Sequence, residues 1–120
     1  MRNEADVRRV VGSFGLDILE DMPSSVDEQI RLFREASLIV SPHGSALANL
    51  VWCEPGTRVI ELFSRSYTKR HFAYLSHLLG LDYAYLIDDS PKPQHWTQVD
   101  EDMSVDLRAL GRALEEAGAV

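Results

Sequence analysis

Apolar positions along the chain recur at two spacings, which predict alternating helices and strands. A helix is predicted where apolar side chains repeat every three or four residues, as in Val26, Ile30 and Phe33. A strand is predicted where a short continuous apolar run lies between turn-forming residues, and the run 37–40 has the pattern of a central strand covered on both faces. The predicted helices are Glu4 to about Ser13, a helix that follows Ser25, Ala46–Cys53, Thr68–Leu79 and about Ser104–Ala117, and the predicted strands are 16–19, 37–40, 58–63 and 82–87. This alternation with short links predicts one domain, 1–120, with a Rossmann-like three-layer α/β sandwich and a mostly parallel sheet.

Turn and cap residues support these boundaries. Gly15 and Gly80 stand where left-handed caps would end the first and fourth helices. Ser25 and Glu28 have the spacing of a capping box at the start of the second helix. Residues 54–57 place proline and glycine at the two central positions of a type II turn.

Charge and cysteine content narrow the possible partners. The chain has 120 residues, and 12 Lys+Arg against 19 Asp+Glu give a formal charge of −7. This acidic balance argues against nucleic acid or an anionic membrane surface as a partner, because both require clustered cations. No apolar run approaches the roughly 20 residues of a membrane span. The single cysteine, Cys53, excludes an internal disulfide and is expected to be a small buried hydrophobe. The simplest location for such a domain is the cytoplasm.

The polar loop after the run 37–40 is the best place for chemistry. In a parallel sheet, ligands bind beyond the carboxyl ends of strands and beside helix N-termini. Gly44 would let an anion such as phosphate approach the backbone. Ser45 is either a donor to a phosphate oxygen or a plain helix N-cap. His43 either donates to a diphosphate leaving group or is a structural or solvated side chain.

Other polar residues also have two interpretations each. Glu61, inside an apolar strand, either is buried with a partner near a ligand, where it could accept from ribose hydroxyls, or faces water at an edge. Glu28 is favoured as a capping residue, whereas the cap does not explain Gln29. His71 and His77 lack the i, i+4 spacing of a metal pair and are expected to be surface or packing residues, so no metal site is predicted.

Taken in order, several short motifs resemble glycosyltransferase family 61. They are Arg2-Asn3-Glu4, Ser25 with Glu28-Gln29, Leu32-Phe33 and Ala36, then Val40-Ser41-Pro42-His43-Gly44-Ser45-Ala46-Leu47-Ala48-Asn49-Leu50, and then Pro55-Gly56-Thr57-Arg58-Val59-Ile60-Glu61-Leu62. The family includes plant xylan-modifying transferases, secretory O-linked GlcNAc transferases and bacterial capsular polysaccharide biosynthesis proteins. The resemblance runs from Arg2 to about Tyr85.

This resemblance implies the C-terminal half of a GT-B-type enzyme, which holds a nucleotide-sugar donor such as a UDP-sugar. Transfer would invert the anomeric centre without a required metal or other cofactor. The resemblance also implies that His43, Gly44 and Ser45 contact the diphosphate and that His43 assists its departure. Asn49 would brace that loop, and Arg2 and Asn3 would lie close to the phosphates. Glu28, Gln29 and Glu61 would line or support the nucleotide pocket.

The chain also departs from the family pattern. Relatives carry a strand before the Arg2-Asn3-Glu4 segment and an N-terminal half before that strand. We therefore expect the acceptor site and the catalytic base to lie in a missing half. The resulting hypothesis is a donor-binding half for polysaccharide or glycan biosynthesis, active as an inverting transferase only when a partner chain completes it. The alternative is a non-catalytic module whose open sheet edge pairs with a partner or with a second copy.

Overall fold

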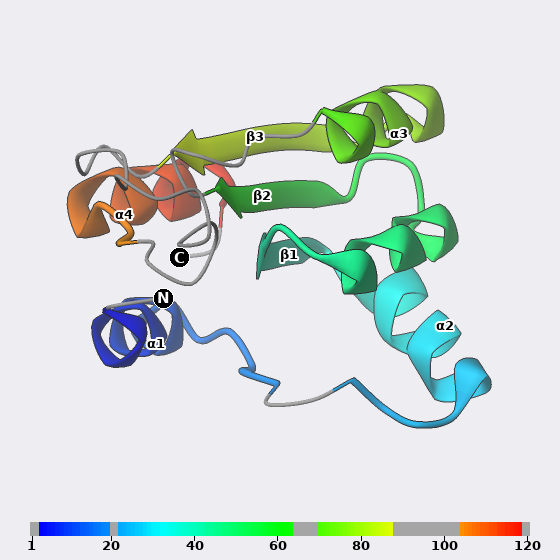
Figure 1. Ribbon diagram of the computed structural model, residues 1–120, viewed down its shortest axis with the longest axis horizontal. Coiled ribbons are helices and arrows are strands. Elements are labelled where there is room, and N and C mark those ends of the chain that lie inside the picture. The colour runs from blue at the N-terminus through cyan, green and yellow to red at the C-terminus, as the bar shows by residue number, and fades with distance from the viewer. Residues whose placement is uncertain (1–2, 20–21, 64–69, 88–103, 119–120) are drawn as a thin grey trace, which may run out of the picture. The chain divides into compact units, whose positions relative to one another are not determined.

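The computed structural model describes residues 3–19, 22–63, 70–87 and 104–118. In chain order the elements are α1 (Glu4–Ser13), α2 (Val26–Glu35), β1 (Leu38–Pro42), the 3-10 helix η1 (Ser45–Trp52), β2 (Arg58–Phe63), α3 (His71–Leu79), β3 (Asp82–Ile87) and α4 (Leu107–Glu116) (Figure 1). They form two compact units. The sheet unit comprises described residues 19, 22–61 and 70–84, and the terminal unit comprises 3–18, 62–63, 85–87 and 104–118.

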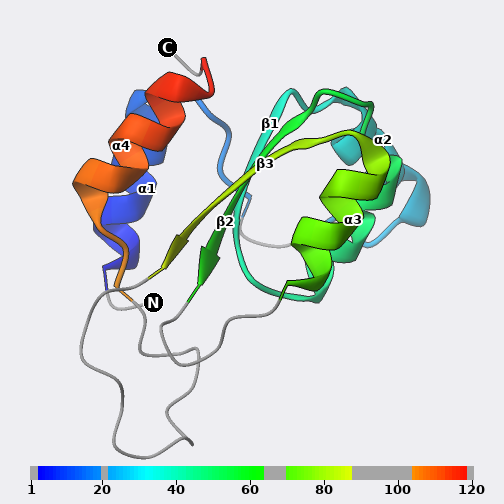
Figure 2. The same ribbon diagram turned by 90° about the horizontal axis from the view of Figure 1, so that it is seen from above.

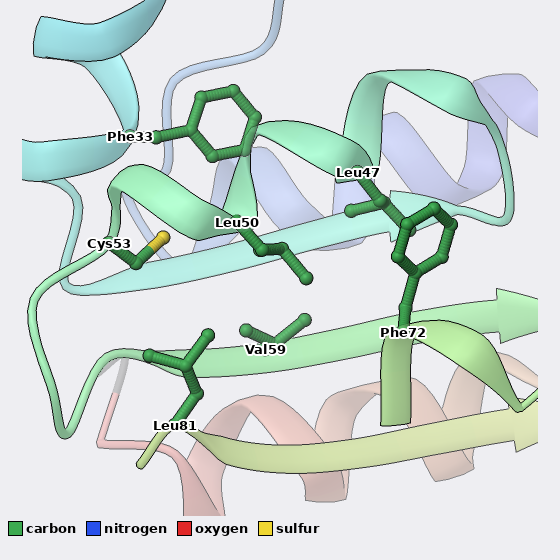
Figure 3. Close-up of a cluster of buried hydrophobic side chains, with 7 residues drawn as sticks. All are labelled: Phe33, Leu47, Leu50, Cys53, Val59, Phe72 and Leu81. Carbon is green, nitrogen blue, oxygen red and sulfur yellow. The ribbon is translucent and has the colours of Figure 1, made fainter. Parts of the chain in front are cut away.

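The strands form a parallel sheet in the order β1-β2-β3, which fits a Rossmann-like α/β fold (Figure 3). Each strand is joined to its neighbour by a helical crossover, η1 or α3. Crossovers of one hand that advance in one direction put their helices on one face of the sheet. Helices α2 and α3 lie on that face in Figure 2.

The prediction of a central strand at 37–40 was wrong. Among the described strands, β1 is at an edge and β2 is central. The side chains of β2 from Val59 to Phe63 are all buried, whereas Leu38, Ile39 and Val40 are only half-buried. A continuous apolar run therefore marked a strand correctly but not its place in the sheet.

The core of the sheet unit lies between the helices and the sheet, as Figure 3 shows. Its members come from the helices of the unit, from the middle strand and from the residues that follow η1 and precede β3: Phe33, Leu47, Leu50, Cys53, Val59, Phe72 and Leu81. The side chain of Leu50 is fully buried, and removing such a side chain typically costs about 2–5 kcal/mol. Val26 is 65% exposed, so the apolar stripe predicted for α2 is buried only toward the end that leads into β1.

The predicted turn at Gly56, the left-handed cap at Gly80 and the Ser25 half of the predicted capping box are confirmed. Gly56 has φ 90°, and the Thr57 N–H donates to the Glu54 carbonyl at 3.1 Å, as a type II turn requires. Gly80 ends α3 in the left-handed region at φ 73°. The Ser25 hydroxyl accepts from the backbone N–H three residues later at 3.4 Å.

In the terminal unit, α1 and α4 pack side by side (Figure 2). Val7 of α1 and Leu110 and Leu114 of α4 are buried. The Asn3 side chain ties the start of α1 to the segment before α4: its Nδ2 donates to the Val105 carbonyl at 2.8 Å, and its Oδ1 accepts from the Val105 N–H at 3.0 Å. Asn3 thus joins positions at opposite ends of the sequence.

Three other predicted boundaries need correction. Residues 16–19 do not form a strand, because they pair with none of the described strands and leave Ile18 and Leu19 exposed. The helix predicted at Ala46–Cys53 is a 3-10 helix that begins one residue earlier. Helix α3 begins at His71 with Arg70 in the N-cap position, and the predicted start at Thr68 lies outside the described residues.

Candidate functional site

His43 lies where the main chain leaves β1 and enters η1, within the sheet unit. This is the carboxyl end of a parallel strand, where α/β proteins place ligands. The His43 side chain is only 13% exposed. Its ring lies against two residues at the start of α3, with centroid distances of 5.2 Å to His71 and 5.4 Å to Phe72. The side chain is therefore held among packed rings rather than extended into solvent.

Glu61 is a buried carboxylate in the middle of β2. Its side chain is 0% exposed. Oε2 lies 2.6 Å from His43 Nδ1, and Oε1 accepts from the Tyr83 hydroxyl at 2.5 Å. Burial of a carboxylate is costly unless donors replace water, and here each oxygen has one. The interpretation of Glu61 as a water-facing edge residue was therefore wrong.

The pairing with Glu61 bears on which nitrogen of His43 carries a proton. An ionised carboxylate only accepts hydrogen bonds, so a bond from His43 to ionised Glu61 requires the proton on Nδ1. The other ring nitrogen, Nε2, is then an acceptor in the neutral ring and a donor in the doubly protonated ring. His43 can therefore keep its bond to Glu61 in both the neutral and the doubly protonated ring.

Gly44 occupies the N-cap position of η1, and Ser45 is the first residue of that helix. The plain N-cap interpretation of Ser45 is therefore wrong, because the cap position falls on its neighbour. Gly44 has an extended backbone with φ 175°, and a Cβ built there meets no heavy atom of the described chain within 4 Å. Neither its conformation nor the described packing requires glycine. The first N–H groups of a helix lack intrahelical partners and favour an anion.

A series of side-chain hydrogen bonds connects the first turn of η1 to the segment before α2. Asn49 Nδ2 donates to the Ala46 carbonyl at 3.1 Å and to Gln29 Oε1 at 3.4 Å. Gln29 Nε2 in turn donates to the Pro23 carbonyl at 2.6 Å. Glu28 is exposed in the first turn of α2. The first turn of η1 is thus tied through Asn49 and Gln29 to the segment before α2.

The remaining predicted ligands are not brought to this loop by the described contacts. Asn3 belongs to the terminal unit and is bonded to Val105, and Arg2 lies outside the described residues. Two contacts of this site were missed: Tyr83 donates to Glu61, and the ring of His71 lies against His43. Tyr83 has the pattern of an ordinary aromatic strand residue. The spacing of His71 from His77 gives no sign that His71 contacts His43.

The rest of the described structure adds three observations. Within the described ranges, no three His, Cys, Asp or Glu side chains are arranged to hold a metal ion. Burial raises the pKa of the Cys53 thiol to about 11, which agrees with the small buried hydrophobe expected there. No helix in the described part of the chain is long and apolar enough to cross a membrane.

Comparison with known proteins identifies the family. Residues 1–60, half of the chain, match the sequence model of Glycosyltransferase 61. The chain belongs to glycosyltransferase family 61. This confirms the resemblance drawn from the motifs. In this family 61 chain the matched segment includes the whole loop from His43 to Asn49 and ends just before Glu61.

Two plant proteins are among the relatives of this family 61 chain. It is 41% identical over 59 residues to beta-1,2-xylosyltransferase RCN11 of Oryza sativa subsp. japonica. This match covers 49% of this chain and 11% of the rice protein. It is 29% identical over 89 residues to a beta-1,2-xylosyltransferase of Arabidopsis thaliana, which covers 72% of this chain and 16% of that protein. The matches therefore span only a small part of each plant enzyme.

Proposed function

We propose that this chain binds the diphosphate of a nucleotide-sugar donor, a UDP-sugar, at the loop of His43, Gly44 and Ser45. It would serve as the donor-binding half of a GT-B-type glycosyltransferase in polysaccharide or glycan synthesis. The observation that carries the proposal is the pairing of His43 with buried Glu61 beside the N-terminus of η1. Family membership supports glycosyl transfer as the reaction class. The names of the plant relatives make xylose the first sugar to test.

The loop has the groups that a diphosphate requires. Doubly protonated His43 would donate from Nε2 to a phosphate oxygen and so stabilise the departing diphosphate. The unpartnered N–H groups at the start of η1 would add further donors. The open space beside Gly44 would let a phosphate come close to the main chain, and a methyl group at that position would obstruct it.

The other residues would support this site or complete the pocket. Asn49 and Gln29 would hold the first turn of η1 in place, as their hydrogen bonds suggest. Glu28 would lie toward the nucleotide. Transfer would proceed with inversion and without a required metal or cofactor. The acceptor site and the catalytic base would belong to the N-terminal half of such a GT-B-type enzyme.

Calorimetric titration with UDP, followed by UDP-xylose, tests the proposal. Gly44→Ala should keep the fold, since the new Cβ has space, yet weaken UDP binding by at least about tenfold, as expected when charge-assisted bonds are lost. His43→Ala should weaken binding at least as much. The matched controls are Gly12→Ala in α1, where a Cβ also meets nothing within 4 Å, and His77→Ala on the exposed side of α3.

Two results would contradict the proposal. One is the absence of saturable UDP binding at millimolar concentration by the wild-type chain. The other is an affinity that Gly44→Ala and His43→Ala leave equal to that of their controls.

A further inference from the structure

We propose that Glu61 and Tyr83 are positioning residues for His43, with Tyr83 acting through the Glu61 carboxylate. Together they would set the tautomer and the orientation of the His43 ring, and Glu61 would not itself touch the nucleotide. The consequence for donor binding rests on the proposed function. The effect on the His43 ring does not.

The burial of Glu61 argues against direct contact with a ligand. Its side chain is 0% exposed, and each of its oxygens already accepts from a protein donor at 2.5 or 2.6 Å. Because the side chain has no exposed surface, a ribose hydroxyl could reach it only if the side chains that cover it moved. Glu61 therefore influences the site through the loop side chain to which it is bonded, His43.

Tyr83 is required because one hydrogen bond does not hold a carboxylate in one orientation. The terminal torsion of a glutamate side chain is broad, so a carboxylate with a single partner can rotate away from His43. Tyr83, on β3, anchors the second oxygen from the neighbouring strand. With both oxygens engaged, the acceptor for His43 Nδ1 stays at one place on the rigid sheet.

His43 depends on this anchor because its own backbone lies in a loop. The ring is flanked by Phe72 and His71, which restrict its position but do not distinguish its two nitrogens. The directional bond to Nδ1 does so, and a fixed first contact is what orients a functional side chain for its ligand. Tyr83 is thus assigned a role in this site that its sequence context gave no sign of.

The test reads the tautomer of His43 directly. Long-range ¹H–¹⁵N NMR spectra of the ¹⁵N-labelled chain are recorded at mildly alkaline pH, where neutral imidazole prevails. His43 should be protonated mainly on Nδ1, and exposed His77 provides an internal reference for an unconstrained ring. His43→Ala assigns the signals. A wild-type His43 protonated mainly on Nε2 would overturn the proposal before any variant is made.

Tyr83→Phe keeps the ring and removes only the hydroxyl. It should move the His43 signals toward the reference pattern and weaken UDP binding by about three- to tenfold, the size expected for one lost hydrogen bond. Tyr74→Phe makes the same chemical change at a tyrosine of α3 that is 67% exposed, and it should change neither reading. Glu61→Gln is the second variant if Tyr83→Phe does not fold, because its amide offers one acceptor oxygen where the carboxylate offered two.

Each combination of results decides the matter. Wild-type signals in Tyr83→Phe, or weaker UDP binding without a change at His43, would refute positioning through His43. A changed tautomer with unchanged UDP affinity would refute the role in binding. If the wild-type chain binds no UDP, the proposed function fails, and the NMR spectra still decide whether Tyr83 and Glu61 orient the ring.

Discussion

The contact between Tyr83 and Glu61 predicts energetic coupling that unfolding experiments can measure. Tyr83→Phe leaves Oε1 of a fully buried carboxylate without its tyrosine donor. Hydrogen bonds to charged groups contribute about 1.5–3 kcal/mol, so the free energy of unfolding should fall by that amount. After Glu61→Leu the hydroxyl no longer meets a carboxylate, and removing it should cost less than about 1 kcal/mol. The coupling energy should therefore be at least about 0.5 kcal/mol.

The double-mutant cycle is more informative than Glu61→Leu alone. Leucine removes a buried charge, which is favourable, and also takes away the acceptor for His43 and Tyr83, which is unfavourable. The sign of that single change is a balance of two large effects. The cycle cancels them and isolates the interaction between the two side chains.

Urea unfolding of the four proteins, followed by far-UV circular dichroism and tryptophan fluorescence, gives the required free energies. The two signals must coincide, because the chain has two compact units and the cycle assumes one transition. A second cycle that pairs Glu61→Leu with Tyr74→Phe should be additive. A coupling below about 0.5 kcal/mol for Tyr83 would show that the hydrogen bond does not exist in solution or contributes nothing.

Two further changes test the packing of each unit. Asn3→Ala should lower the free energy of unfolding by about 1–3 kcal/mol, because the N–H and C=O of buried Val105 lose their partners. Asn3→Asp keeps the acceptor and should lose less, and equal stability of all three proteins in urea would contradict the contact. The pKa of Cys53 is raised from 9.0 to about 11, so the contribution of the thiol to stability should be constant below pH 9. It should decline between pH 9 and pH 11, by at most about 3 kcal/mol. Cys53→Ala should lack this decline, and a stability difference between the two proteins that is independent of pH would refute the prediction.

Local features of this fold could be predicted from the sequence. The bounds of β2 and β3 and the turn at Gly56 were predicted correctly because strand pattern and turn chemistry act over a few residues. The rank of a strand in a sheet depends on which strands pair, and the apolar run of β1 gave no information about that. The run 16–19 has the composition of a strand, but a strand forms only where a partner is available.

The site could be predicted only in part for the same reason. The glycine-containing loop after β1 pointed to the correct place for a ligand, since strand ends are where ligands bind. The pattern also marked Glu61 as unusual, because a carboxylate stands among apolar neighbours. What it lacked was the identity of the partners. His43 and Tyr83 are 18 and 22 positions from Glu61, on opposite sides of it in the sequence, and no periodicity connects them.

That arrangement has a consequence for how the chain acquires its shape. The loop after β1, the middle of β2 and the start of β3 each contribute one side chain to the same network. The network cannot form in a hairpin or in any single βαβ segment, so it appears only when the third strand has docked. For contacts at such separations, the entropy of closing the loop is lost before the contacts themselves stabilise the chain. A buried carboxylate that gains its last donor at this step would penalise every intermediate in which the sheet is incomplete, and so make the assembly of the three strands more nearly all-or-none.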